Sequence, residues 1–327
     1  MSVLVTGAAG FIGFHVSSQL LELGFEVIGV DNFNDYYDVK LKESRFELLK
    51  ERKGLSFMRI NIADKEKMFN NFKGSEDITS VVHLAAQAGV RYSLVNPYAY
   101  IESNVMGQLV LLELCRTFPN LKHLVYASSS SVYGGNQKLP FSEKDPVDQP
   151  VSLYAATKKT DELMGNVYSN LYGMRITGLR FFTVYGPWGR PDMSAYIFTK
   201  AIFEDRPIQL FNNGNMRRDF TFIDDIAEGV LSVLNGKNNK LSGDGKHQIY
   251  NIGNNRPEEL IRYIEVLEES IGKAAIIENA PMQPGDVTAT YADISAINND
   301  FGFIPKTPIE IGLPKFVEWY RDFHGII

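Results

Sequence analysis

A glycine-rich run near the start of the chain limits its possible folds more than any other sequence feature. The apolar segment Ser2–Thr6 has the pattern of a strand, and a helix is predicted over Phe11–Leu23. At the junction stand Gly7, Gly10 and Gly13. Glycine lets the backbone turn sharply and approach a ligand, and the amide groups of a helix N-terminus attract a bound pyrophosphate. The spacing predicts the first strand–turn–helix unit of a nucleotide-binding sheet.

The rest of the first half alternates short apolar runs with longer segments of helical period. Such alternation is typical of a parallel sheet covered by helices on both faces. The predicted strands are residues 2–6, 25–30, 55–60, 78–85, 122–127 and 175–181. The clearest further helices are Ala99–Phe118 and Tyr154–Tyr172. We predict an α/β fold, a Rossmann-type doubly wound parallel sheet with a smaller, mixed α/β substrate domain toward the C-terminus.

The alternation of predicted strands and helices ends after about residue 184, where shorter segments are separated by proline and glycine. We expect the dinucleotide-binding domain to span residues 1–184, with segments returning to it near 220–255. The substrate domain would then comprise residues 185–219 and 256–327. The charged stretch Asn34–Lys53 is interpreted as containing a solvated surface helix.

Asp31, at the end of the second predicted strand, selects the nucleotide. A carboxylate in this place accepts hydrogen bonds from the adenosine ribose and repels a 2'-phosphate, which favours NAD over NADP. With the three glycines, the other residues predicted to contact NAD lie at the ends of the first four strands. They are Phe11, Ile12, Asp31, Asn32, Asn61, Ile62, Leu84, Ala85 and Ala86.

Tyr154 and Lys158 stand four residues apart at the start of a predicted helix and therefore project from one face. A free tyrosine, with a pKa of about 10, is a poor base, but a neighbouring ammonium and the positive nicotinamide ring both stabilise a phenolate. The strand over residues 122–127 delivers a run of serines at its carboxyl end, where such sheets bind ligands. We predict that Tyr154, Lys158 and Ser129 are catalytic and that Tyr154 and Lys158 also contact NAD.

Taken together, these motifs resemble the extended short-chain dehydrogenase/reductase family, whose members act on nucleotide-linked sugars. The resemblance covers nearly the whole chain. The family's dehydratases carry Thr-Asp-Glu where Ser129, Ser130 and Ser131 stand, and its decarboxylases carry glutamate at the last of these positions. The lack of these acids disfavours both reactions and leaves reversible oxidation of the sugar as the simplest chemistry.

Longer segments are most similar to the UDP-glucuronate 4-epimerase branch, among them residues 31–38, 88–93, 180–193 and 283–287. The resemblance implies inversion of carbon 4 through a 4-keto sugar, with NAD tightly bound and regenerated in each turnover. Thr183, where galactose-type epimerases have asparagine, suits a sugar ending in carboxylate. The predicted substrate-binding residues are Arg91, Ser129, Ser130, Thr183, Arg190, Gln209, Phe211, Arg218 and Asp286.

Several alternatives stay open at this point. The reaction could be decarboxylation of UDP-glucuronate, or epimerisation of another UDP-hexose or of an N-acetylated uronate. The chain could also be a non-catalytic NAD-binding sensor, although a sensor needs neither Tyr154 nor Lys158. Arg190 could contact the uronate carboxylate, a phosphate or only solvent, and Arg218 could hold the pyrophosphate or form a salt bridge to Asp219. Phe211 could serve in strand packing alone.

Composition narrows the possible partners. A formal net charge of -6 argues against nucleic acid, and the five histidines show no metal-ligand spacing. There is no apolar run near 20 residues, which disfavours a membrane span. Cys115 is the only cysteine and is expected to be a small buried thiol. We expect a cytoplasmic enzyme, and the resemblance implies a homodimer formed through helices 99–118 and 154–172.

Overall fold

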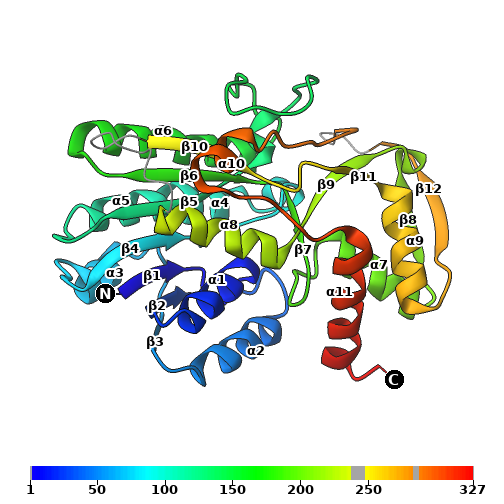
Figure 1. Ribbon diagram of the computed structural model, residues 1–327, viewed down its shortest axis with the longest axis horizontal. Coiled ribbons are helices and arrows are strands. Elements are labelled where there is room, and N and C mark those ends of the chain that lie inside the picture. The colour runs from blue at the N-terminus through cyan, green and yellow to red at the C-terminus, as the bar shows by residue number, and fades with distance from the viewer. Residues whose placement is uncertain (1, 237–246, 283–286, 327) are drawn as a thin grey trace.

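The computed structural model describes residues 2–236, 247–282 and 287–326 of the chain. Its dominant feature is a 7-stranded parallel sheet with the strand order β10-β6-β5-β4-β1-β2-β3 (Figure 1). The order changes direction between β1 and β4, so this is the predicted doubly wound sheet. Its strands are β1 (Ser2–Thr6), β2 (Glu26–Asp31), β3 (Leu55–Arg59), β4 (Ile78–His83), β5 (His123–Ser129), β6 (Ile176–Phe181) and β10 (His247–Ile252).

Helices cover both faces of this sheet. On one face α1 packs against α8 and α2, and on the other α5 packs against α3 and α6. Each face has its own cluster of buried hydrophobic side chains, and the smaller cluster includes Cys115, which is buried as expected. These helices are α1 (Phe11–Glu22), α2 (Val39–Lys50), α3 (Lys65–Phe72), α5 (Gly107–Cys115), α6 (Leu153–Tyr172) and α8 (Ile223–Asn235).

The second half of the chain adds a mixed α/β region beyond one end of the large sheet (Figure 1). It contains a 3-stranded sheet, β11-β9-β7, and a 2-stranded sheet, β12-β8. The strands are β7 (Thr183–Tyr185), β8 (Pro207–Phe211), β9 (Arg217–Phe222), β11 (Pro257–Glu259) and β12 (Ile276–Ala280). The helices are α7 (Ser194–Phe203), α9 (Leu260–Ile271), α10 (Ser295–Phe301) and α11 (Ile309–His324).

Two later segments were predicted to return toward the large sheet. β10 does so and pairs with β6 along its whole length. Residues 220–222 instead lie in β9 of the 3-stranded sheet, and α8, which follows directly, packs on α1. The chain therefore crosses between the two regions more than once, and the predicted domain boundaries stay a prediction.

The helix predicted over Ala99–Phe118 is not continuous. It consists of α4 (Pro97–Tyr100), a π-helical segment η2 (Ile101–Met106) and α5. The buried Asn104 lies in the π segment, where its amide nitrogen donates to Gln87 O (3.1 Å) and Thr157 Oγ1 (2.9 Å). Its side-chain oxygen accepts from Gln87 N at 2.8 Å. A local widening of the helix of this kind is common at functional sites, and here it joins the loop after β4 to α6.

The charged segment after β2 was interpreted as a solvated surface helix, and for α2 this interpretation is wrong. Arg45 is fully buried, donating to Ala9 O (3.0 Å), Tyr37 Oη (2.8 Å) and Trp188 O (2.6 Å). Its five N–H groups can satisfy several separate acceptors, which a hydrophobic pattern does not reveal. α2 is thus anchored both to the turn after β1 and to the loop after β7.

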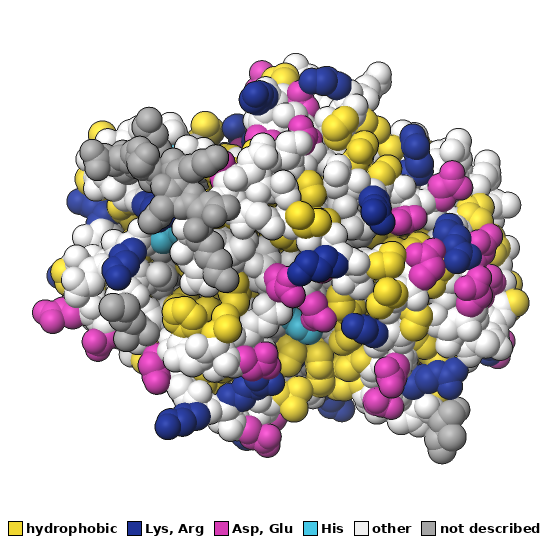
Figure 2. Space-filling view, viewed as in Figure 1, with side chains coloured by type: hydrophobic (Ala, Val, Ile, Leu, Met, Phe, Trp, Pro, Cys, Tyr) yellow, Lys and Arg dark blue, Asp and Glu magenta, His cyan; other side chains and the backbone are white. Residues whose placement is uncertain are grey.

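The surface drawn in Figure 2 mixes charges of both signs. Basic and acidic side chains are interspersed over this face, with hydrophobic side chains among them. No helix in the described part of the chain combines the length and the hydropathy that a membrane span requires.

Candidate active site

One cavity, with a volume of about 960 Å³, lies where the carboxyl ends of the large sheet meet β7, β8 and β9. All the predicted site residues of the described chain line it, whereas Asp286 lies outside the described residues. Those on the large-sheet side are Gly7, Gly10, Phe11, Ile12, Gly13, Asp31, Asn32, Asn61, Ile62, Leu84, Ala85, Ala86, Ser129, Ser130, Tyr154 and Lys158. The others are Arg91, Thr183, Arg190, Gln209, Phe211 and Arg218.

The turn between β1 and α1 depends on its glycines. Gly7 has a φ of +72°, in the left-handed region, and a Cβ there would lie 2.7 Å from Ala85 N. At Gly13 a Cβ would lie 2.0 Å from Gly7 O, because the helix passes directly over the turn. Only glycine fits at these positions, and the fit opens the N-terminus of α1 toward the cavity.

Asp31 closes the same end of the cavity from the tip of β2. Its carboxylate accepts hydrogen bonds from Phe33 N (2.8 Å) and Ala9 N (3.1 Å). Burial raises the pKa of this carboxyl group, and the two backbone donors and Lys42 partly oppose that rise. Two oxygens offer about four lone-pair directions, so acceptor capacity remains for ligand hydroxyls. The neighbouring Lys42, whose pKa is lowered by burial to about 8, also lines the cavity.

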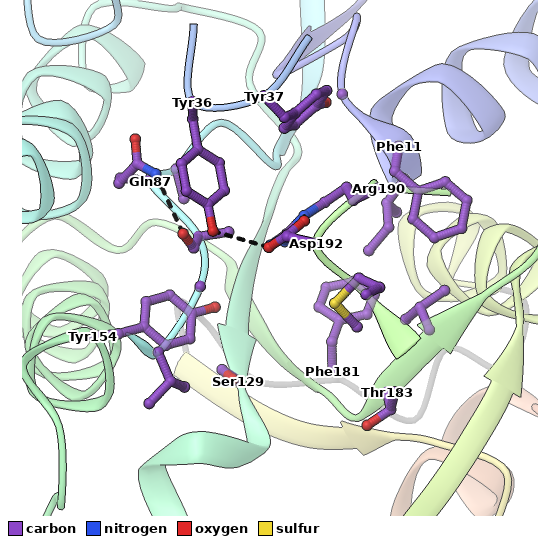
Figure 3. Close-up of a pocket in the computed structure, with 18 of the residues that line it drawn as sticks. Phe11, Tyr36, Tyr37, Gln87, Ser129, Tyr154, Phe181, Thr183, Arg190 and Asp192 are labelled. Atoms are coloured by element: carbon purple, nitrogen blue, oxygen red, sulfur yellow. Dashed lines mark hydrogen bonds and ion pairs between the residues drawn. The ribbon is translucent and has the colours of Figure 1, made fainter. Parts of the chain in front are cut away.

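Tyr154 enters the cavity from the first turn of α6. Ser152 caps this helix by accepting a hydrogen bond from Ala155 N at 3.1 Å, which fixes where the helix begins. The Tyr154 ring packs edge-on against Tyr100 with centroids 6.0 Å apart. Figure 3 shows Tyr154 reaching into the cavity near Ser129, the last residue of β5. Because β5 ends two residues later than predicted, the strand itself carries this serine.

Lys158 lies one turn beyond Tyr154 and is held more firmly than the sequence indicated. Its ammonium donates to Ala127 O (2.9 Å) and to Asp161 Oδ2 (3.0 Å). The side chains of Lys158 and Asp161 are only 4% and 2% exposed, so this is a buried ion pair. The sequence prediction assigned Lys158 no carboxylate partner.

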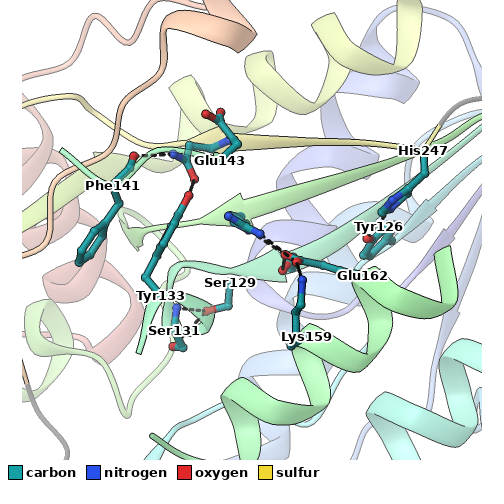
Figure 4. Close-up of polar contacts among 12 residues, drawn as sticks. Tyr126, Ser129, Ser131, Tyr133, Phe141, Glu143, Lys159, Glu162 and His247 are labelled. Carbon is teal, nitrogen blue, oxygen red and sulfur yellow. Dashed lines mark hydrogen bonds and ion pairs between the residues drawn. The ribbon is translucent and has the colours of Figure 1, made fainter. Parts of the chain in front are cut away.

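A second buried ion pair, between Glu162 and Arg180, lies beside the serine run (Figure 4). Glu162 accepts two hydrogen bonds from Arg180 (2.7 and 2.9 Å) and one from Ser128 Oγ (2.7 Å). Burial would raise the pKa of Glu162, but Arg180 holds it below the ordinary value. The pair fixes α6 against β5 and β6, and thereby fixes Tyr154 relative to Ser129.

Arg190 lies on the loop after β7 and has a close partner. Its guanidinium binds both oxygens of Asp192, one at 2.9 Å, and Asp192 also accepts a hydrogen bond from Tyr36 Oη at 2.9 Å. Burial would raise the pKa of Asp192, but Arg190 holds it below the ordinary value. Figure 3 shows Tyr36 extending across the cavity from the segment after β2 to meet this pair.

The remaining predicted substrate residues come from separate elements. Arg91, in the short η1 helix (Arg91–Leu94), stands 5.7 Å from the ring centre of Phe211 at the end of β8. Gln209, two residues earlier on β8, donates to Glu278 of β12. Arg218 lines the cavity, whereas Arg217 is exposed, as their alternation along β9 requires. Asp219, weighed as an alternative partner for Arg218, is fully buried and accepts backbone hydrogen bonds.

Several cavity residues were not predicted. The most informative are polar residues that flank the predicted ones: Asn34, Tyr36, Tyr37, Lys42, Gln87 and Asp192. Four of them follow Asp31 in the distinctive segment 31–38 and in α2. That segment carried the family resemblance, so the signal was present, but nothing local showed that these side chains turn toward the cavity.

Comparisons with known proteins agree over the full length of the chain. The model of a family described as "NAD dependent epimerase/dehydratase family" matches residues 3–253. UDP-glucuronate 4-epimerase 4 of Arabidopsis thaliana is 47% identical over 99% of this chain and 76% of that protein. Protein CapI of Staphylococcus aureus is 47% identical over 99% of both. The structure of UDP-glucuronic acid 4-epimerase from Bacillus cereus in complex with UDP-glucuronic acid and NAD has a TM-score of 0.89 and 33% identity, covering 99% of this chain and 100% of that one.

Proposed function

Because the chain belongs to the NAD dependent epimerase/dehydratase family, we propose that it inverts carbon 4 of UDP-glucuronate to give UDP-galacturonate. The observation that carries this proposal is the 47% identity to a curated UDP-glucuronate 4-epimerase over 99% of the chain. The cavity supports it, since Tyr154, Lys158 and Ser129 line the same space as the glycine turn and Arg190. The chain is an NAD-dependent UDP-sugar 4-epimerase on this evidence, and glucuronate is the proposed sugar.

The residues at one end of the cavity fit NAD. The glycine turn admits no Cβ at Gly7 or Gly13, so the backbone amides at the start of α1 lie open to a pyrophosphate. Asp31 keeps acceptor capacity for ribose hydroxyls after its two backbone hydrogen bonds. NAD held there would supply reversible hydride transfer at carbon 4 of the sugar.

In the proposed mechanism Tyr154 accepts the proton of the 4-hydroxyl group and later returns one to the 4-keto oxygen. Ser129 hydrogen-bonds to the same oxygen, since it lies beside Tyr154 at the end of β5. Lys158 supplies a fixed positive charge next to them. No net oxidation results, so we expect NAD to remain bound between turnovers.

The 4-keto sugar must rotate to present its other face to the nicotinamide, while the nucleotide part of the substrate stays fixed. We assign the uridine and pyrophosphate to Arg91, Gln209, Phe211 and Arg218, which line the cavity from η1, β8 and β9, whereas Tyr154 lines it from α6. An arginine fork suits a pyrophosphate because it presents several donors in one plane. The sugar can then rotate about its link to the diphosphate without leaving the cavity.

The proposed intermediate is a β-keto acid, which loses carbon dioxide when the carboxylate bond aligns with the carbonyl π system. We assign Ser130, Thr183 and Arg190 to hold the carboxylate away from that alignment. Replacing Thr183 with Val or Arg190 with Ala should lower kcat/KM by about a hundredfold and release a UDP-pentose. Product analysis by mass spectrometry measures both, and unchanged turnover without pentose would contradict the assignment.

A homodimer is the proposed assembly. Hydrophobic side chains are exposed along the outer faces of η2, α5 and α6, where Leu163, Val167 and Leu171 repeat every four residues on α6. They are 56%, 48% and 68% exposed. An apolar stripe of this kind favours helix–helix packing with a second copy. Replacing Val167 and Leu171 together with Asp should give monomers in sedimentation equilibrium, whereas an unchanged mass would contradict the proposed interface.

Incubation of the purified protein with UDP-glucuronate, with no added NAD, tests the function directly. Formation of UDP-galacturonate, resolved by chromatography, would support the proposal. Release of carbon dioxide would indicate a decarboxylase, and activity only with a neutral hexose or an N-acetylated uronate would reassign the substrate. Absence of turnover with all of these, in a protein that retains NAD, would favour the sensor alternative.

A further inference from the structure

Asp161 is the carboxylate closest in sequence to the proposed catalytic pair, and no role follows for it from the reaction itself. It lies on α6, three residues after Lys158, and its Oδ2 accepts from the Lys158 ammonium at 3.0 Å. Its other oxygen, Oδ1, is buried without a hydrogen-bond partner in the described part of the chain. A carboxylate with one orphaned oxygen is costly to bury, so a buried Asp161 directly behind Lys158 needs a structural explanation.

The contacts of Lys158 supply a geometric reason. An ammonium has three N–H donors. Two of them are directed to Ala127 O and Asp161 Oδ2, at 2.9 and 3.0 Å. Lys158 also lines the cavity, so its third N–H is left for a ligand or for Tyr154. Without Asp161 the flexible four-carbon side chain would lose one of the two anchors that fix this direction.

The charge of Asp161 has a separate consequence. Asp161 forms an ion pair with the Lys158 ammonium at 3.0 Å, which favours the carboxylate, although burial raises its pKa to about 6. An ionised carboxylate beside the ammonium weakens the positive field that favours a tyrosinate nearby.

The other titratable groups packed around Lys158 and Asp161 do not weaken the positive field of Lys158 in this way. Glu162 on α6 is compensated by Arg180 of β6 and by Lys159. His83 of β4 and His247 of β10 have pKa values lowered by burial to about 3 and 4, so they are neutral. Tyr100 of α4 and Tyr126 of β5 have pKa values raised by burial and are also neutral.

We propose that Asp161 is a positioning residue for the epimerisation, which fixes one N–H of Lys158 toward the cavity and sets the acid limit of the pH range in which Tyr154 accepts a proton. The proposal rests on the proposed function for its kinetic part. Its structural part concerns only Lys158 and bound NAD.

Two substitutions separate position from charge. Asp161→Asn keeps the size and one acceptor oxygen but removes the charge, and Asp161→Leu removes both. Asp300→Asn is the control, because Asp300 also accepts a part-buried hydrogen bond, from Tyr250 Oη at 2.6 Å, and neither Asp300 nor Tyr250 lines the cavity. Circular dichroism and thermal melting identify any variant that fails to fold.

For Asp161→Asn we expect the acid limb of the kcat profile to move down by about one pH unit, with KM unchanged. For Asp161→Leu we expect kcat to fall about a hundredfold, because Lys158 is no longer aligned. Asp300→Asn should match the parent in both. An acid limb that stays in place or moves up in Asp161→Asn, or an Asp161→Leu variant with parental kcat, would overturn the proposal.

A second readout does not require turnover. NAD released on denaturation, measured after dialysis of each holoenzyme, should be lower in Asp161→Leu and parental in Asp161→Asn. Ultraviolet difference absorbance of the holoenzymes reports phenolate formation, with Tyr154→Phe as the blank, and should show the same shift of about one pH unit. If the parent makes no UDP-galacturonate, the proposed substrate is wrong, but these two measurements still decide the role of Asp161.

Discussion

The two ends of the cavity are built in different ways. The end assigned to NAD is shaped by backbone: Gly7 and Gly13 let α1 pass over the turn after β1, and Asp31 is held by two backbone amides. The end assigned to the sugar is shaped by side chains that meet from distant elements, such as Tyr36 with Asp192. One end is therefore fixed by the fold itself, and the other by contacts that single substitutions can change.

This difference shows how one architecture can keep its cofactor and vary its substrate. A site made of main-chain geometry changes only if the sheet changes, whereas side chains on loops can be exchanged without disturbing the core. Variants at the two ends should accordingly fail in different ways. Substitutions near the large sheet should affect the stability of the fold or the rate of the chemical step. Substitutions on the loops should affect which ligand binds and how fast it dissociates.

Tyr154 lies where the two ends meet, and its replacement should have the largest effect. Tyr154→Phe keeps the ring that packs against Tyr100 but removes the hydroxyl that accepts the proton. We expect kcat to fall about a thousandfold, with NAD content and UDP-glucuronate affinity unchanged. Kinetics and isothermal titration calorimetry measure the two quantities. A variant that loses NAD or sugar binding together with turnover would place Tyr154 in one end only.

The comparison also explains what the sequence could predict. Strand alternation, the glycine turn and Asp31 are local patterns, and the sheet followed from them correctly. The residues predicted to contact NAD all line one cavity, and their role stays a prediction. Tyr154 and Lys158 were identified from their spacing and from the strand that precedes them. Tyr154 and Lys158 are four residues apart on one helix, so a short stretch of sequence is enough to identify the pair.

The unpredicted features depend on partners far apart in the chain. In the π segment, Asn104 donates hydrogen bonds to Gln87 O and Thr157 Oγ1. A helical sequence pattern does not reveal these contacts. Tyr36 and Asp192 are 156 residues apart. The pairing of Lys158 with Asp161 is an exception, since its i,i+3 spacing on a helix was visible. The charge pattern alone could not show that this pair is buried.

Two tyrosine–histidine pairs extend the comparison to stability. His247, the first residue of the edge strand β10, shares a hydrogen bond of 2.8 Å with Tyr126 Oη. His324 on α11 shares one of 2.7 Å with Tyr196 Oη. Burial lowers the pKa of His247 to about 4, and His324 is exposed. Between pH 6.5 and 4, His247 is protonated in the unfolded chain but not in the folded chain. The free energy of unfolding therefore falls as the pH falls.

At pH 5 this difference amounts to about 2 kcal/mol for His247. We expect His247→Gln to lose about that much less stability than the parent between pH 7 and pH 5. His324→Gln should change the pH dependence in the same direction but by less, because partial burial also lowers the pKa of His324 while its side chain is largely exposed to solvent. Urea unfolding at the two pH values measures each change. Equal effects of the two substitutions would show that the sheet edge and α11 respond to acid alike.

Tyr36 joins the two ends, and its replacement should have the smallest effect. Its hydroxyl donates to Asp192 across the cavity at 2.9 Å, and its ring packs on Tyr92 with centroids 4.7 Å apart. Tyr36→Phe keeps the ring and removes a hydrogen bond to a charged acceptor, which should speed NAD release about tenfold. Stopped-flow transfer of NAD to a competing dehydrogenase measures this rate. Tyr250→Phe, which loses a similar bond to Asp300 away from the cavity, is the control. If both variants release NAD at the parental rate, the contact between the two ends does not retain the cofactor, and retention must come from the backbone end alone.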